Sequence, residues 1–432
     1  MATQAISTTP IADRARRRIT RRLMPYLFIL YIIAVLDRAN VGYAALEMTK
    51  DLGFSPEVYG FGAGVFFFGY VLLEIPGGLI AEKWSARGWI ARIMISWGVV
   101  AALMGFIRTA PQFYALRFLL GLAEAGFYPG VVVYISHWFR YEDRAKTMAM
   151  FLAAIPTSYI IGAPLSGVLL GLNWFGIPGW RWLFILEAAP AIIFGVATLF
   201  YLTDHPSQAK WLPPEEREWI ASELEREKES KQQVRSYNVW EAFKHREIIL
   251  LTCGYFLICG TGYGYSFWLP TMIKALSGLP NLMVGIVSAL PSCAGLISLQ
   301  LMGRSSDRSK ERRWHTAAPM LVAGAGFLLS ALLQNHPALA IACFCLAAAG
   351  LHGYQPSLWS LPASFLTGSA AAATFGLINS IGSLAGFVGP YIVGYLKKTT
   401  NSFFGSMLYL SLSAICAGCF ILTLRQGRRK IM

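Results

Sequence analysis

Charged residues are scarce in this chain of 432 residues: 14% are Asp, Glu, Lys or Arg, whereas 55% are hydrophobic and the mean hydropathy is +0.50. Soluble domains carry about 25% charged residues, so this composition excludes an ordinary soluble protein and indicates many membrane spans. A cleavable signal is also missing. The basic start of the chain runs into an apolar stretch, Leu23 to Leu46, that is too long for a signal-peptide core.

The groups that catalysis needs are missing from the apolar stretches, which contain no activated nucleophile, metal-ligand cluster or phosphate-binding loop. We therefore expect a protein that is not an enzyme and needs no cofactor. A sensor is disfavoured as well, because the short tails hold no signalling domain. The seven cysteines all fall in apolar stretches. We expect the one Cys-x-x-Cys pair, Cys416 and Cys419, to fill space rather than to carry redox chemistry.

What the chain does contain is a series of twelve apolar windows and one long polar segment, Thr203 to Arg246. The windows lie near 23–46, 58–81, 89–108, 112–136, 147–171, 182–202, 248–273, 282–303, 316–334, 337–359, 373–396 and 401–424. We predict an all-α polytopic membrane protein with twelve transmembrane helices in two pseudo-symmetric six-helix bundles. The expected parts are a basic tail (1–22), an N-terminal bundle (23–202), a central loop (203–246), a C-terminal bundle (247–424) and a short tail (425–432).

The central loop contains one expected helix, which begins at Pro213-Pro214-Glu215. The spacing of Trp219, Ile220 and Leu224 predicts that this helix is amphipathic and lies against the inner face of the bundle.

Lysine and arginine are distributed unevenly between the two expected sides of the membrane. If the N-terminus is inside, the inner segments hold 29 of these 37 residues, the outer loops hold 6, and 2 lie within spans. This bias predicts that both termini are cytoplasmic. The net charge of +14 therefore reflects topology. The basic residues are spread over separate loops and form no continuous face for nucleic acid.

A short motif occurs twice, at a spacing of 225 residues. Each copy has a glycine, an acid, a base and an arginine at offsets 0, 4, 5 and 9: Gly78, Glu82, Lys83 and Arg87 after the second span, and Gly303, Asp307, Arg308 and Arg312 after the eighth. This spacing equals one six-helix half plus the linker, which indicates a tandem duplication. The glycine lets two helices approach closely and the acid can lock one conformation of the inner face, so we expect a gating role.

These two loops resemble the signature loop of the major facilitator superfamily. Three further segments, Leu36–Gly42, Arg117–Gly130 and Ile378–Ser380, resemble its anion:cation symporter family. Within that family the chain is most similar to bacterial carboxylate transporters of the tartrate/phthalate type, and it is also similar to the D-galactonate transporter. The resemblance implies the major facilitator fold, alternating access, and a place in the bacterial inner (plasma) membrane.

Four charged residues lie inside the expected spans: Asp37 and Arg38 in the first, Arg117 and Glu124 in the fourth. A charge at such depth costs about 2.5–3.5 kcal/mol, so these residues persist where they pair or serve a pathway. The set is neutral when both acids are ionised. Protonating an acid would free a guanidinium, which can bind a carboxylate by two parallel hydrogen bonds. The alternative is a static network that pins the helices.

The resemblance assigns roles to these four residues. It implies that Asp37 and Glu124 carry the coupling protons, that Arg38 contacts the substrate carboxylate, and that Arg117 organises the acids.

Three other residues of the N-terminal half are candidates. Tyr70 matches a substrate-facing position of the family, with aromatic packing as the alternative. Glu74, one helical turn after Tyr70, is expected to have a packing or gating role rather than to carry protons. Glu187 is expected to pair with Arg181 near the outer interface.

The C-terminal half lacks acids within its expected spans, so proton coupling must lie in the N-terminal half or involve His352. His352 and Gln355 on the tenth span are candidate substrate contacts, and hydrogen-bonded packing is the alternative. Asn379 and Ser380 on the eleventh span are candidate polar contacts, and Asn379 matches a substrate-contact position of the family. Hydrogen bonding between helices is the alternative for both.

We therefore expect a secondary active transporter that imports a small organic anion together with protons. The expected substrate is a carboxylate of the tartrate, phthalate or sugar-acid kind. The proton gradient would drive transport, and the protein would act as a monomer in the lipid bilayer. A drug–proton antiporter or an organic-anion exchanger of the same fold is the alternative.

Overall fold

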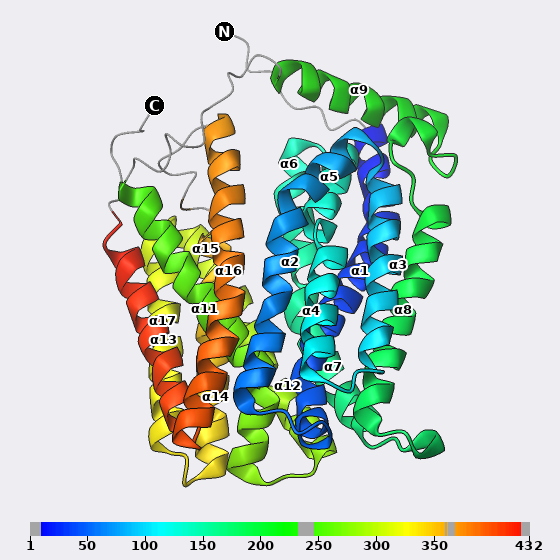
Figure 1. The fold of residues 1–432 in the computed structure, drawn as a ribbon. Helices are drawn as coiled ribbons and strands as arrows, with labels where there is room; N and C mark the ends of the chain where they lie inside the picture. Colours follow the sequence, from blue (N-terminus) through cyan, green and yellow to red (C-terminus); the bar gives the residue numbers. More distant parts are fainter. Residues whose placement is uncertain (1–9, 232–245, 359–360, 362–367, 425–432) are drawn as a thin grey trace.

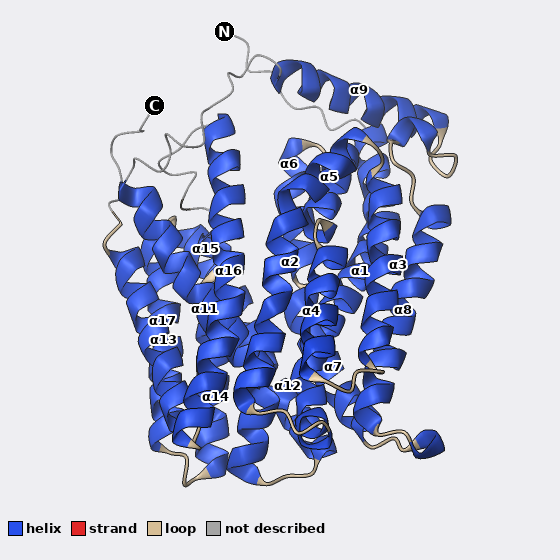
Figure 2. Cartoon of the chain, in the orientation of Figure 1, coloured by secondary structure: helices blue, strands red, loops and turns tan. Residues whose placement is uncertain are grey.

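The computed structural model of the chain describes residues 10–231, 246–358, 361 and 368–424. Within these residues the regular secondary structure is helical, and Figure 2 shows helices joined by loops with no strand among them. The expected fold class, an all-α protein built from many apolar helices, is confirmed.

The helices of the two halves of the chain stand in two neighbouring groups (Figure 1). The first group consists of α1 (Pro10–Asp51), α2 (Pro56–Lys83), α3 (Ala86–Met104), α4 (Ala110–Glu124), α5 (Phe127–Trp138), α6 (Tyr141–Leu152), α7 (Ala154–Leu170) and α8 (Gly179–Tyr201). The polar helix α9 (Pro214–Lys231) follows. The second group consists of α11 (Arg246–Ser277), α12 (Asn281–Ser309), α13 (Arg313–Leu332), α14 (Pro337–Gly353), α15 (Gln355–Leu358), α16 (Gly368–Thr400) and α17 (Phe404–Leu422).

Eleven helical segments of the described chain are long and apolar enough to cross a membrane. Helix α16, with 33 residues packed between α2 and α11, adds a twelfth long helix to the bundle.

Three segments are interrupted where the sequence predicts one continuous helix: α4 gives way to α5, α6 to α7, and α14 to α15. Hydropathy windows identify the apolar stretch but not a change of backbone angle within it.

The break between α4 and α5 directly follows Glu124. Gly126 has a φ of +86°, a left-handed conformation that residues with a side chain rarely adopt. A Cβ on Gly126 would also lie 2.9 Å from the Cα of Gly77 on α2. The break therefore needs glycine for its backbone angle and for the close approach of α2. As a result, Glu124 is the last residue of α4.

Helix α9 lies across the end of the molecule at which α1 begins and α17 ends (Figure 1). We call this the α9 end and the opposite one the far end. The predicted amphipathic helix is confirmed, because Ile220 is buried and Trp219 and Leu224 pack against the core. Ion pairs hold α9 on the N-terminal half: Arg18 with Glu216 (3.3 Å), Arg140 with Glu223 (3.4 Å) and Arg144 with Glu227 (2.9 Å).

The two halves meet closely toward the far end, where glycines replace larger side chains. Between α2 and α16, a Cβ added to Gly60 would lie 2.6 Å from the Pro390 oxygen, and one added to Gly394 would lie 2.4 Å from the Pro56 oxygen. A Cβ on Gly285 would lie 2.4 Å from the Ala163 oxygen, and a Cβ on Gly42 would lie 2.9 Å from the Phe267 oxygen. These contacts join α2 to α16, α7 to α12, and α1 to α11.

Polar contacts also join the halves in the same region, and the Tyr59 hydroxyl of α2 donates to the Phe267 oxygen of α11 at 2.8 Å. Asn281 of α12 donates from Nδ2 to Glu47 Oε1 of α1 at 2.7 Å, and Lys398 of α16 pairs with Glu57 of α2.

Gly285→Ala should lower the apparent melting temperature in detergent, because its Cβ would lie 2.4 Å from a backbone oxygen of α7 and the two helices must separate. Overpacking of this kind costs about 1–3 kcal/mol. Gly262→Ala on α11 is the matched control, since no atom lies within 4 Å of its Cβ. Equal melting temperatures for the two variants would contradict the close contact between α7 and α12.

Candidate functional site

A buried ion pair between α1 and α4 forms the centre of the candidate site. Arg38 donates from Nη2 to Oε1 of Glu124. Glu124 is fully buried, whereas 21% of the Arg38 side chain is exposed, so Arg38 is the more accessible partner of the pair. The Arg38 Cζ lies 5.1 Å from the ring centroid of Tyr70 and 5.4 Å from that of Phe66. These rings give the cation a fixed platform.

Asp37 is adjacent to Arg38 in the chain but has a different partner. Its Oδ1 accepts from Asn40 Nδ2 at 3.4 Å, and its Oδ2 has no hydrogen-bond partner. Asp37 is 1% exposed, and none of the ion pairs found among the described residues includes it. The four charges come together from α1 and α4, as the sequence indicates, but only Glu124 is matched to a cation.

Arg117 is fully buried and is bound to the backbone of α2. Its Nε donates to the Gly62 oxygen at 3.3 Å and its Nη2 to the Ala63 oxygen at 3.0 Å. Its Cζ lies 4.9 Å from the ring of Phe66, on which Arg38 also rests. Arg117 therefore ties α4 to α2 beside the ion pair, with carbonyl groups as its hydrogen-bond partners.

Glu74 connects the N-terminal half to α16. Asn379 donates from Nδ2 to Glu74 Oε1 at 2.5 Å, and Ser380 donates from Oγ to Oε2 at 3.4 Å. Tyr255 of α11 donates from its hydroxyl to Asn379 Oδ1 at 3.3 Å. The two α16 residues that the sequence offers as substrate contacts are therefore bound to a carboxylate of the other half. The expected packing or gating role for Glu74 fits this contact.

His352 and Gln355 contact each other within the C-terminal half. The Gln355 Nε2 lies 3.4 Å from His352 Nδ1. The His352 ring fills the space beside Gly295, where an added Cβ would lie 2.4 Å from the ring. The hydrogen bonds found in the described chain do not join this pair to Arg38. No group of three or more His, Cys, Asp and Glu that could hold a metal ion is found among the described residues.

The expectation that Glu187 pairs with Arg181 is wrong. Arg181 donates from Nη1 to the Gly105 oxygen at 2.8 Å, whereas Glu187 is buried and accepts from Ser166 Oγ at 2.9 Å. The two residues are six positions apart on α8, so they point to different sides of the helix.

The two copies of the repeated motif pack alike at their glycines. A Cβ would lie 3.3 Å from Pro129 if added to Gly78, and 3.5 Å from Pro356 if added to Gly303. Each motif glycine thus faces a proline of a neighbouring helix, α5 in one half and α15 in the other.

The charged residues of the two copies differ in their partners. In the second copy, Asp307 pairs with the motif's own Arg312 at 2.8 Å, and Arg308 is exposed. In the first copy, Lys83 is exposed, while the acid and the arginine bind neighbouring elements: Glu82 lies 3.5 Å from His137, and Arg87 lies 3.8 Å from Asp204. The acid and the arginine therefore bind each other only in the C-terminal copy.

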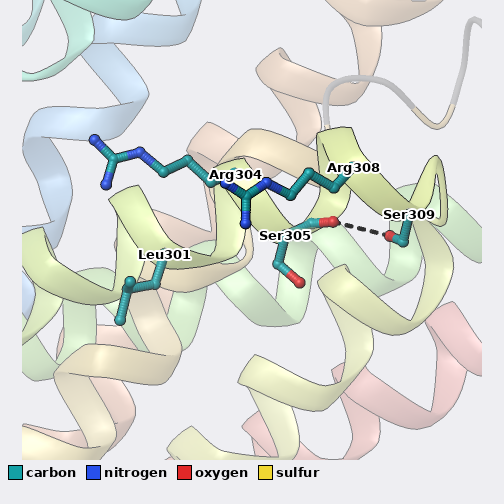
Figure 3. A pocket seen from close by; sticks show the side chains of 5 residues that line it. All are labelled: Leu301, Arg304, Ser305, Arg308 and Ser309. Carbon is teal, nitrogen blue, oxygen red and sulfur yellow. Dashed lines mark hydrogen bonds between the residues drawn. The ribbon is translucent and has the colours of Figure 1, made fainter.

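A hollow of about 560 Å³ lies on α12 near the α9 end. It is lined by Leu301, Arg304, Ser305, Arg308 and Ser309. Figure 3 shows both arginines reaching outward from the helix, with Ser309 bonded to the Ser305 carbonyl at 3.0 Å. All five residues belong to one helix, so the hollow is a surface depression away from the Arg38–Glu124 ion pair.

Sequence reasoning assigned no role to Asn40 or Phe66, which belong to the site. Asn40 binds Asp37, and Phe66 lies beneath both arginines. Helical spacing offered a signal for both, because Asn40 is three residues after Asp37 and Phe66 is four before Tyr70.

Two bundles of apolar helices with charged residues buried between α1 and α4 define an α-helical membrane transport protein. The family description that matches residues 27–390, most of the chain, is Major Facilitator Superfamily. The chain belongs to this superfamily, whose members are transporters and not enzymes. The resemblance seen in the sequence is thereby confirmed.

Curated relatives match nearly the whole chain. A protein of Agrobacterium vitis named "Putative tartrate transporter" is 44% identical over 402 residues, which cover 93% of this chain and 92% of the relative. A "Quinolone resistance transporter" of Acinetobacter baumannii is 38% identical over 397 residues, which cover 92% of this chain and 91% of that protein. Among solved structures, a bacterial homologue of the human lysosomal transporter Spinster has a TM-score of 0.73 at 15% identity, covering 97% of this chain and 96% of that one. At that identity the likeness shows the fold alone.

Arg117→Lys should lower the thermal stability of the protein more than Arg38→Lys does. A lysine cannot reach the carbonyls of Gly62 and Ala63 with one planar group, so one of two charge-assisted bonds is lost, at about 1.5–3 kcal/mol. Arg38 lies partly exposed on aromatic rings and tolerates the change better. Thermal unfolding in detergent compares the two variants. A smaller loss for Arg117→Lys would contradict its placement on the α2 backbone.

Proposed function

We propose that the protein imports a small organic carboxylate together with protons by alternating access. The observation that carries this proposal is the ion pair of a partly exposed arginine, Arg38 of α1, with a fully buried glutamate, Glu124 of α4. An arginine that is released from its own carboxylate can bind the carboxylate of a substrate in the same way. The name of the relative at 44% identity supports tartrate or a similar dicarboxylate as substrate.

The proton would act through Glu124. While Glu124 is ionised it holds the Arg38 guanidinium, and an incoming anion gains little. Protonating Glu124 ends this attraction and frees the guanidinium for substrate. Proton binding and anion binding then favour each other by the same coupling free energy. Asp37, buried without a cation, would bind the second proton, since a lone carboxylate in an apolar interior is costly.

The expected topology assigns the two ends of the molecule to the two sides of the membrane. The charge bias of the sequence predicts that the α9 end faces the cytoplasm. The glycine contacts that join the halves lie toward the far end, so we propose that this structure is the form closed to the outside. In this proposal the protein is a monomer in the inner membrane of a bacterium, both termini are cytoplasmic, and the proton gradient drives it without a cofactor.

Drug–proton antiport is the second candidate, and the relative named as a quinolone resistance transporter favours it. The two functions differ in the direction in which the substrate moves relative to the protons. Uptake into proteoliposomes that is stimulated by an inward proton gradient supports symport, whereas substrate movement against the proton flow supports antiport.

Asp37→Asn and Glu124→Gln should each abolish the accumulation of a carboxylate driven by an inward proton gradient. Neither variant can exchange a proton at the substituted position. Both should retain counterflow exchange, which needs no net proton movement and also shows that the variant is folded. The measurement is uptake of labelled L-tartrate, phthalate and D-galactonate. Normal accumulation by both variants would refute the coupling assignment.

Arg38→Lys should weaken carboxylate binding roughly tenfold or more, because one of two parallel charge-assisted bonds is lost. Arg108→Lys, at an exposed arginine, is the matched control and should bind as the wild type does. Calorimetric titration with the same three anions measures the difference. Unchanged affinity in Arg38→Lys would remove Arg38 from the substrate site.

A further inference from the structure

Glu74 of α2 contacts Asn379 and Ser380 of α16. Of the described α2–α16 contacts, this one lies nearest the α9 end. From the far end, α2 meets α16 at Gly60, then at Gly64, which faces Phe387, then at Phe67, which faces Gly386, and last at Glu74. The first three are contacts of backbone and aromatic carbon. Glu74 is charged, 6% exposed, and meets two hydrogen-bond donors of the other half.

The two donors form a binding place for a carboxylate. An amide N–H of Asn379 and the hydroxyl of Ser380 each approach a different oxygen of one carboxyl group, at 2.5 and 3.4 Å. The Tyr255 hydroxyl donates a hydrogen bond to the amide oxygen of Asn379, which keeps the amide N–H of Asn379 directed at Glu74. Any carboxylate of suitable reach could take these two bonds.

Glu74 also lies on the same side of α2 as the platform for Arg38. Tyr70, whose ring centroid is 5.1 Å from the Arg38 Cζ, is one helical turn away from Glu74. Glu74 is close enough to Arg38 for their charges to attract, although they form no direct ion pair among the described residues. The Glu74 carboxylate therefore stands between the reachable cation of one half and a pair of donors on the other.

We propose that Glu74 is an internal competitor of the substrate: its carboxylate takes the Asn379 and Ser380 donors that the substrate carboxylate takes in turn. This inference rests on the proposed function and adds the C-terminal half of the binding site to it. Substrate entry exchanges one carboxylate for another on the same donors, so the number of hydrogen bonds is unchanged. The return of Glu74 then favours release of the substrate.

The chain offers a matched control for simple loosening of the helix contact. Glu57 is also a carboxylate of α2 bound to α16, through Lys398, but it lies at the far end and partly exposed. Glu57→Gln removes an α2–α16 link without touching the donors at Asn379 and Ser380.

The test measures the dissociation constants of L-tartrate, phthalate and D-galactonate for the wild type, Glu74→Gln, Glu74→Ala and Glu57→Gln by calorimetry in detergent. The Glu74 variants should bind the preferred anion about fivefold more tightly or better, the lower end of coupling between sites. Glu57→Gln should bind as the wild type does. In transport, Glu74→Gln should lower both KM and the maximal rate, because release slows.

A double-mutant cycle gives an independent readout. In an Asn379→Ala background, Glu74→Gln should no longer tighten binding, since the contested donor is gone. Lower melting temperatures of the Glu74 variants without tighter binding would make Glu74 a structural link and overturn the inference, while gradient-driven uptake by the wild type would still support the proposed function. Equal tightening in Glu57→Gln would overturn it as well. Failure of every variant to bind any of the three anions would remove both proposals.

Discussion

The attraction between Arg38 and Glu124 inside an apolar helix bundle is the interaction on which the rest of the site depends. Neither charge is stable at that depth alone, so the helix that carries one must bring it within reach of the charge on the other helix. This requirement turns Arg38 of α1 and Glu124 of α4 toward each other. It also leaves Asp37, the next residue in the chain, without a cation and with Asn40 as its partner. The uneven pairing gives the two acids different surroundings: one faces a guanidinium and the other an amide.

Helix α2 connects the parts of the site. It provides Phe66 and Tyr70 beneath Arg38, the two carbonyls that hold Arg117, and the carboxyl group of Glu74 that reaches α16. Its glycines let α16 approach along the same helix, so a change in the contact between the halves is felt directly by the residues under Arg38. A substrate that bridges Arg38 and Asn379 would act on that same helix. In the proposed mechanism, packing of the two halves and substrate binding would therefore both depend on α2.

Much of the architecture could be predicted because it follows from local properties of the chain. Apolar windows located the long helices, and isolated charges marked α1 and α4. Hydropathy alone did not place the breaks in α4–α5, α6–α7 and α14–α15, because it does not register backbone angles such as that of Gly126. The bonds from Arg117 to carbonyls were hidden, since every residue has such an acceptor. The Glu74–Asn379 contact spans 305 residues and depends on how the halves meet.

Helix α9 has a practical consequence that follows from its attachment. Its ion pairs join it to Arg18, Arg140 and Arg144, which all belong to the N-terminal half. We therefore expect α9 to move together with that half as one rigid body. Its outer surface is polar and lies outside the apolar bundle. A dye on that surface and a second dye at the start of α13 would therefore convert the tilt of one half against the other into an optical signal. No label would need to enter the lipid.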